Sequence, residues 1–189
     1  MSPIVPPDAW IRDTLFSMTA NEIRAAQAPL KARYRAEPAA AQLTLTAQGA
    51  IDANAQVCRV ETHIGGVEAG LHPATGGDGS QACSGDMLLQ ALVACAGVTL
   101  GAVATAMGVD VRGGRVSAEG DLDFRGTLGV SREAAVGFDR IRLRFDLETD
   151  APADTVSKLI ELTERYCVVL QTLRKGPEVS VSVQARAGR

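Results

Sequence analysis

The sequence predicts a mixed fold of α-helices and antiparallel β-strands, and three observations carry this prediction. An almost wholly apolar run at 84–108 is long enough for a helix and too long for an ordinary strand. A second helical pattern, with apolar residues three and four apart, occupies 150–175. Residues 140–148 alternate apolar and charged side chains, which is typical of a half-buried antiparallel strand. Further strand patterns complete the order strands, helix, strands, helix, strand.

The N-terminal residues predict an added arm. Residues 1–7 contain three prolines and predict an unstructured lead, and residues 8–16 predict a short helix. Thr19 and Glu22 form a capping-box pattern, in which each side chain bonds the other residue's free amide, and the helix should run to about Arg35. No basic region followed by an apolar run marks a secretory signal at the N-terminus, so we expect a cytoplasmic protein.

Three strand patterns lead to the central helix. Residues 42–48 and 56–63 alternate in polarity, and Gly65-Gly66 predicts a hairpin turn into a third strand at 67–71. A loop at 70–85, rich in Gly, Pro and Ser, then connects the third strand to the helix.

The apolar run at 84–108 has a defined start and end. Side-chain oxygens of Ser84 and Asp86 can accept the free N–H groups of the first turn, and Gly108 can close the helix in a left-handed turn. Apolar residues cover every face, so we expect a helix that is buried all round. Its length also fits a membrane span, but the whole chain has 22% charged residues, close to the norm for soluble domains. We therefore expect a core helix of a soluble protein and no membrane partner.

The remaining elements follow from the same kinds of pattern. Pro152 falls in the first turn of the second helix, where its missing N–H does no harm, and Gly176-Pro177 ends that helix. One face of the helix carries Ile160, Thr163, Cys167, Leu170 and Arg174. We expect a strand at 109–122 broken by Gly113-Gly114, a loop at 124–134, the strand at 140–148 and a last strand at 179–183.

Composition restricts the classes of function. At 189 residues a single domain is the default, and it is long enough to bury a core without disulfides or a structural metal. A net charge of -3 without a basic block, together with 4% aromatic residues, argues against a nucleic-acid partner. No CxxC or HxxxH spacing joins the cysteines and histidines, so we expect no zinc. The glycine-rich stretch 76–80 lacks the lysine of a phosphate loop, and we expect no cofactor.

Four cysteines are the residues with the clearest chemical potential. Cys95 and Cys167 each lie in the interior of a predicted helix, and the two thiols could approach to disulfide distance if the helices pack together. The alternative is that both are inert small hydrophobic residues of the core. Cys58 on a strand and Cys83 in the loop are more readily explained as incidental. Of these two, Cys83 is the better candidate for a reactive thiol, because loops carry accessible groups.

Two segments resemble the OsmC/Ohr family. Residues 84–100 resemble its central-helix signature, in which an acidic residue and a Leu-Leu pair lead through small residues to the reactive cysteine. Residues 164–173 resemble its second-cysteine helix, and the likeness extends over about 42–183. The resemblance implies a two-layer α+β fold, with antiparallel sheets wrapped around two central helices in an intertwined homodimer. It divides the chain into an N-terminal helical arm, 1–40, and an OsmC-like domain, 41–189.

The resemblance also implies a reaction, the thiol-dependent reduction of organic hydroperoxides at two sites on the dimer interface. Carried over by position, Cys95 is the peroxidatic thiol and Cys167 the resolving thiol, while Asp86 stands where family members often have glutamate. A sulfenic acid on the first thiol would condense with the second to a disulfide. A small dithiol or a lipoylated protein would then restore both thiols by exchange.

The sequence departs from the family pattern around the thiols. Peroxidatic members pair an arginine with the acidic residue to hold the thiolate, and the loop at 72–78 contains no arginine. Arg59, Arg174 or a protonated His72 are candidates to replace it, although ordinary surface charge also explains the arginines. Val168 stands where the family often has proline. These departures leave an alternative open, an OsmC-like protein with weak or no peroxidase activity that binds a small hydrophobic ligand. A structural subunit built on the arm is a third possibility.

Overall fold

The computed structural model describes residues 19–62 and 65–185, and its central element is the helix α2 (Ser84–Met107). The helix ends as predicted at Gly108, which adopts the left-handed conformation with φ of 69°. Its N-cap is Cys83, which makes no side-chain capping bond, so the predicted caps at Ser84 and Asp86 are wrong. The predicted lead and first short helix lie outside the described residues.

An antiparallel pair of long strands covers one side of α2. These strands are β5 (Gly113–Leu122) and β6 (Phe138–Glu148), and Val116 lies opposite Phe145 in their register. Their apolar side chains pack toward α2, while Arg142 on the other face pairs with Asp121. The alternation predicted for 140–148 is therefore confirmed, and it fixes which face of the sheet meets the helix.

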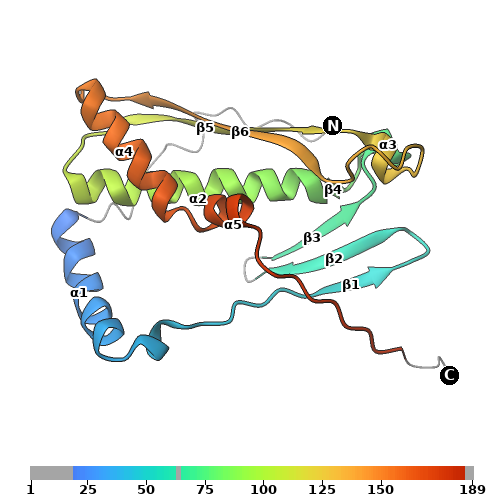
Figure 1. The fold of residues 1–189 in the computed structure, drawn as a ribbon, viewed down its shortest axis with the longest axis horizontal. Coiled ribbons are helices and arrows are strands. Elements are labelled where there is room, and N and C mark those ends of the chain that lie inside the picture. Colours follow the sequence, from blue (N-terminus) through green and yellow to red (C-terminus); the bar gives the residue numbers. More distant parts are fainter. Residues whose placement is uncertain (1–18, 63–64, 186–189) are drawn as a thin grey trace.

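The second predicted helix is in fact two. Helix α4 (Ala153–Tyr166) and helix α5 (Val168–Lys175) are separated by Cys167, whose φ of -71° and ψ of 106° are extended. Cys167 is thus the C-cap of one helix and the N-cap of the next. Both helices lie across α2 (Figure 1), so the break brings a helix start against the middle of the molecule.

A second sheet extends from the region where α2 begins (Figure 1). Its strands follow the order β1-β2-β3-β4, and the last pair is parallel. Between the elements lie the short helical turns η2 (Pro38–Ala41), η3 (Pro73–Thr75) and α3 (Phe124–Thr127), the last within the predicted loop. The strands are β1 (Gly49–Asp52), β2 (Val57–Thr62), β3 (Gly65–Gly70) and β4 (Ala82–Cys83).

Two predicted strands are not paired. Residues 42–48 and 179–183 form no ladder in the described chain, and the first strand begins only at Gly49. Leu45 is 84% exposed and Val181 is 87% exposed. An alternating pattern makes a strand only where it pairs with a partner edge, and neither segment pairs with a strand among the described residues.

The core lies along one stripe of α2. Leu92, Ala96, Leu100 and Ala104 are its buried residues, four apart, and they pack against Cys167 and Leu159. Val98 on another face is 77% exposed, so the expectation of burial on all sides is wrong for the single chain. Among the described helices, α2 alone is long and apolar enough to cross a membrane, a test that core helices of soluble proteins also pass.

The arm helix α1 (Ala20–Ala36) forms as predicted. The Thr19 hydroxyl accepts a hydrogen bond from the Glu22 N–H at 3.2 Å, and the Glu22 carboxylate accepts one from the Thr19 N–H at 2.7 Å. The helix has no buried side chain, and it lies near the C-terminal end of α2 (Figure 1). Few apolar contacts therefore tie it to the rest of the chain.

Candidate thiol site between the helices

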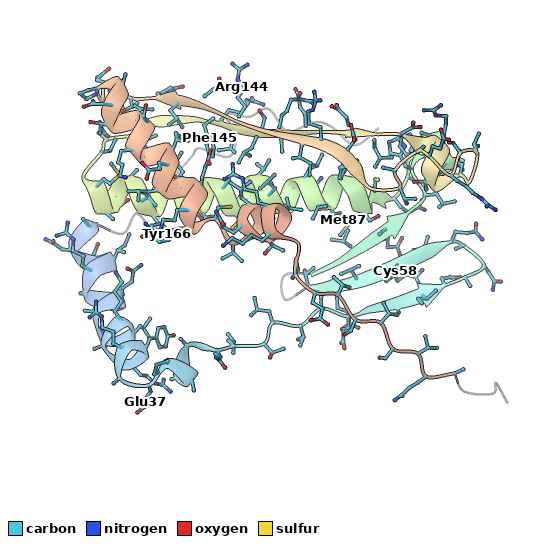
Figure 2. All side chains as sticks on the ribbon, in the orientation of Figure 1. Glu37, Cys58, Met87, Arg144, Phe145 and Tyr166 are labelled. Atoms are coloured by element: carbon cyan, nitrogen blue, oxygen red, sulfur yellow. The ribbon has the colours of Figure 1, made fainter. Side chains whose placement is uncertain are left out.

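The site consists of Cys95 in the middle of α2 and Cys167 at the break between α4 and α5. Cys167 belongs to the buried cluster that includes Leu92 and Ala96, and Cys95 packs against the same cluster. In Figure 2 the labelled Tyr166, directly before Cys167, lies where α4 gives way to α5 beside α2. The structure thus brings together the two thiols that the sequence singled out.

The two sulfur atoms differ in their access to solvent. Cys167 is 0% exposed, whereas Cys95 is partly exposed, and both are free thiols. A molecule that arrives from solvent therefore meets Cys95 first. Cys167 lies in the buried cluster against which Cys95 packs.

The pKa values of the two thiols shift in opposite directions. Burial alone would raise the pKa of Cys95, but hydrogen bonds to its sulfur from the Val169 N–H, the Cys167 thiol, the Thr99 hydroxyl and the Val168 N–H outweigh burial and lower it. These amides begin α5, where the first N–H groups of a helix have no intrahelical acceptor. Thiolates are favoured at helix starts for this reason.

Cys167 shows the opposite balance. Burial raises the pKa of its thiol, and the neighbouring Cys95 raises it further, while the N–H groups of Leu170 and Val169 offset only part of this. Deprotonating a second sulfur beside an existing thiolate is unfavourable, because like charges repel. The site therefore favours a thiolate at Cys95 and a neutral thiol at Cys167.

The two predicted arginines have other partners. The Arg59 Nε lies 2.6 Å from a carboxylate oxygen of Glu68 on the neighbouring strand. An Arg174 guanidinium nitrogen lies 2.9 Å from a carboxylate oxygen of Glu164. Each guanidinium is thus engaged in an ion pair, and neither acts on the Cys95 sulfur within the described chain.

Asp86 and His72 lie at the start of α2, away from the thiol pair. They line a cavity of about 460 Å³ together with Cys83. The Nδ1 of His72 accepts a hydrogen bond from the Ala74 N–H at 3.0 Å, and its ring stacks on Phe124 with centroids 5.0 Å apart. Asp86 and Cys95 are nine positions apart on α2, a rise of about 14 Å, so the single chain does not bring them together.

A second cavity, of about 390 Å³, lies between β6 and the helices α4 and α5. Its walls include Leu92, Phe145 and Leu170, and Glu164 and Arg174 also line it. Leu92 and Leu170 also belong to the packing around Cys167, so this cavity adjoins the thiol pair.

Sequence reasoning missed three donors to the Cys95 sulfur, namely the Thr99 hydroxyl and the N–H groups of Val168 and Val169. Spacing could have indicated Thr99, because residues four apart lie on one helix face. The amides could not be found, since they become available only where the helix breaks. Among the described residues, no group of three or more His, Cys, Asp or Glu side chains could hold a metal ion.

Fold and site together define an α+β protein with two adjacent thiols. One thiol lies in the middle of a central helix, and the other lies at the break between two helices that pack against it. The chain belongs to the OsmC-like protein family, whose model matches residues 77–182, more than half of the sequence. No curated protein matches the chain significantly.

Solved structures share the fold at low sequence identity. An OsmC-like protein from Mycoplasma pneumoniae has a TM-score of 0.61 and 12% identity, over 71% of this chain and 90% of that one. An organic hydroperoxide resistance protein from Elizabethkingia anophelis has a TM-score of 0.57 and 14% identity, over 71% and 92%. The corresponding protein OsmC from Legionella pneumophila has a TM-score of 0.55 and 16% identity, over 71% and 93%. These values support a common fold.

Proposed function

We propose that this protein reduces organic hydroperoxides with the Cys95 and Cys167 thiols. The observation that carries the proposal is the pairing of a partly exposed thiol of lowered pKa with a buried thiol of raised pKa. A peroxidase of this kind needs one nucleophilic thiolate and one protonated thiol held beside it. Two proteins of similar fold are described as organic hydroperoxide resistance proteins, which agrees with this chemistry.

The first step consumes the peroxide. The Cys95 thiolate attacks the outer peroxide oxygen, the O–O bond breaks, and the alkoxide leaves and takes a proton to become an alcohol. Cys95 is then a sulfenic acid, oxidised by two electrons.

The second step joins the two sulfur atoms. The Cys167 thiol attacks the sulfenic sulfur, the S–O bond breaks, and the departing hydroxide takes the thiol proton to leave as water. The product is a Cys95–Cys167 disulfide, and a neutral Cys167 supplies the proton that this step requires. A small dithiol or a lipoylated protein then reduces the disulfide by two exchanges and becomes a disulfide itself.

We further propose that the active form is a cytoplasmic homodimer. In the single chain α2 leaves Val98 exposed, and two alternating segments have no partner strand within 19–62 and 65–185. A second copy could cover the apolar face and offer edges to both segments. The same dimer would bring charged residues of the partner close to the thiol pair.

Turnover of cumene hydroperoxide with dithiothreitol tests the enzymatic proposal. The wild type should consume peroxide catalytically, and Cys95→Ser should fall to the rate of the uncatalysed reaction. Cys58→Ser is the matched control, since Cys58 lies on β2 outside the thiol pair, and it should retain the wild-type rate. Equal rates for the wild type and Cys95→Ser would overturn the proposal.

The alternative is an OsmC-like protein that binds a small hydrophobic ligand with little peroxidase activity. The cavity of about 390 Å³, whose walls include Leu92, Phe145 and Leu170, favours this second function. Replacing Leu170 by Glu would place a charge in that cavity. Loss of binding of a fluorescent apolar probe in Leu170→Glu, combined with no turnover in the wild type, would support the alternative.

A further inference from the structure

The arm helix α1 contacts little of its own chain, although its sequence needs support. Pro29 lies inside the helix, where it removes one backbone hydrogen bond and disfavours the helical form. A helix of 17 residues is marginal in water unless other residues pack against it. Yet α1 has no buried side chain, and it lies near the C-terminal end of α2 (Figure 1). We therefore expect another surface to cover α1.

One side of α1 carries two adjacent stripes of side chains. Ile23, Leu30 and Tyr34 lie seven and four positions apart, so they share a helix face. Leu30 is 46% exposed and Tyr34 is 40% exposed. The residue that follows each of them in sequence belongs to a basic stripe, which consists of Arg24, Lys31 and Arg35.

The basic stripe has no acidic partner within the part of the chain that the structure describes, where none of its members forms an ion pair. Helix α1 contains four basic residues and one acidic residue, a net charge of +3. The whole chain has a net charge of -3, so the rest of the chain carries -6. An acidic surface of a second copy is therefore a fitting partner for α1.

A pocket of about 520 Å³ beside α3 has the complementary charge. Four carboxylates and one guanidinium line this acidic pocket, those of Asp121, Asp123, Glu133, Asp139 and Arg125. Arg125 pairs with Asp123 at 2.6 Å, whereas Glu133 and Asp139 are in no ion pair among residues 19–62 and 65–185. Leu122, Ala134 and Ala135 form an apolar part of the wall.

The arm and the acidic pocket lie apart in one chain. Helix α1 is near the C-terminal end of α2, whereas α3 is near its N-terminal end (Figure 1). A helix of 24 residues is about 36 Å long, so α1 does not occupy the pocket of its own chain. A two-fold axis perpendicular to α2 near its middle, where Val98 is 77% exposed, would exchange the two ends. Each α1 would then lie beside the acidic pocket of the other copy.

We propose that the basic stripe of α1 docks into the acidic pocket of a second copy. This inference rests on the proposed homodimer and adds a contact to it. A helix of 17 residues is about 26 Å long and about 10 Å wide. Because that exceeds the pocket, the basic side chains enter and the helix lies over the rim. The stripe of Ile23, Leu30 and Tyr34 then packs beside the apolar part of the wall.

Cross-linking between copies labelled with ordinary and heavy nitrogen tests the contact directly. The two full-length preparations are mixed under conditions in which subunits exchange, and a carbodiimide then joins amines to carboxylates in direct contact. Mass spectrometry should find the peptide of Lys31 joined to that of Glu133 or Asp139, in mixed-label as well as single-label pairs. Lys31→Arg keeps the charge without the reactive amine and should remove this cross-link. Single-label pairs alone would place the contact within one chain and overturn the inference.

Two arginines of the last turn of α1 provide a matched pair of charge reversals. Arg35 belongs to the basic stripe, whereas Arg33 lies on the opposite side of the helix. Both changes to Glu act equally on the helix itself, because they lie at the same end of its dipole. Arg35→Glu should speed deuterium exchange of the α1 amides about tenfold in the dimer, and Arg33→Glu should leave it near the wild-type rate. Equal rates in the two variants would overturn the inference.

Reversing the charge of the pocket tests the other side of the contact. Glu133→Lys combined with Asp139→Lys should also speed exchange of the α1 amides, although both residues lie far from α1 in the chain. Adding Lys31→Glu and Arg35→Glu restores opposite charges and should restore slow exchange. A pocket variant without effect on α1 would overturn the inference.

Sedimentation velocity of the same samples separates this inference from the proposals on which it rests. A wild-type dimer without the cross-link would overturn the arm contact and leave the homodimer standing, whereas a monomeric wild type would overturn both. A basic helix can also bind an anionic membrane surface. Protection of α1 that appears only with phosphatidylglycerol vesicles would assign the helix to such a surface and overturn the inference. Peroxide turnover is measured separately, so loss of the arm contact would leave the enzymatic proposal standing.

Discussion

The two cysteines differ in thiol pKa and in exposure because their surroundings differ. Cys95 receives amide and hydroxyl donors and reaches solvent, whereas Cys167 is fully buried and lies next to the first sulfur. Sequence resemblance assigned their roles by position alone. The assignment of these roles is a proposal. The geometry gives a physical reason for it, because a thiolate on one sulfur disfavours a second thiolate on the neighbouring sulfur.

Replacing Cys167 by Ser should separate the first chemical step from the cycle. The Cys95 thiolate would still attack the peroxide, but no resolving thiol would remove the sulfenic acid. We expect consumption of about one equivalent of peroxide per chain, followed by slow turnover, and labelling of Cys95 by dimedone. Cys83→Ser should behave as the wild type. Sustained wild-type turnover in Cys167→Ser would show that resolution needs no second cysteine of the chain.

The pH dependence of the first step follows from the lowered pKa of Cys95. Above this pKa the sulfur is a thiolate and the rate should be constant, and the rate should fall as pH decreases through it. The raised pKa of Cys167 keeps that residue a neutral proton donor over the same range. Stopped-flow measurement of the reaction with cumene hydroperoxide provides the profile. A midpoint as high as that of an unstructured cysteine peptide would contradict the assignment.

At the scale of elements, the helix α2 and the strand β6 could be predicted closely because their patterns are long and regular. The break at Cys167 could not be predicted, because no glycine or proline marks it in the sequence. Residues 160–174 keep helical spacing across the break, so sequence alone continues the helix. Packing of Cys167 and Leu159 against α2 overrides that local preference, and the same break creates the amides of the candidate site.

Leu159 should be among the residues that hold α4 in place. It is 0% exposed and packs with Leu100 and Ala104 of α2. Leu159→Ala removes buried apolar volume and should lower the free energy of unfolding by about 2–5 kcal/mol. Leu128→Ala is the matched control, since Leu128 is 55% exposed, and it should cost less than about 1 kcal/mol. Urea unfolding followed by circular dichroism measures both, and equal costs would show that α4 is not held by this contact.

At the scale of the whole molecule, the single chain leaves apolar surface that a stable fold normally covers. One face of α2 and the alternating segments 42–48 and 179–183 are exposed. The sequence predicted these segments as strands, and the α+β family fold is confirmed. Whether such a segment pairs could not be predicted, because an alternating pattern does not specify its partner strand. The same limit applies to Asp86, which stays remote from Cys95 within one copy.

A charge on the exposed face of α2 tests whether a second copy covers it. Val98 is 77% exposed, and Val98→Glu would place a carboxylate in the proposed dimer interface. Burying an unpaired charge costs about 3–5 kcal/mol, so the dimer should weaken at least about a hundredfold. Val130→Glu is the matched control, since Val130 is 71% exposed and lies in the loop that follows α3.

Sedimentation velocity over a range of protein concentrations measures both variants. If a second copy covers α2, the wild type and Val130→Glu should sediment as dimers and Val98→Glu as a monomer. Backbone amides of 179–183 should exchange with deuterium slowly in the dimer and rapidly in Val98→Glu, because only the dimer would give these residues strand partners. The proposed interface would be wrong if the wild type sedimented as a monomer, or if Val98→Glu formed a dimer as stable as the control. The thiol pair would then be a site formed by one chain alone.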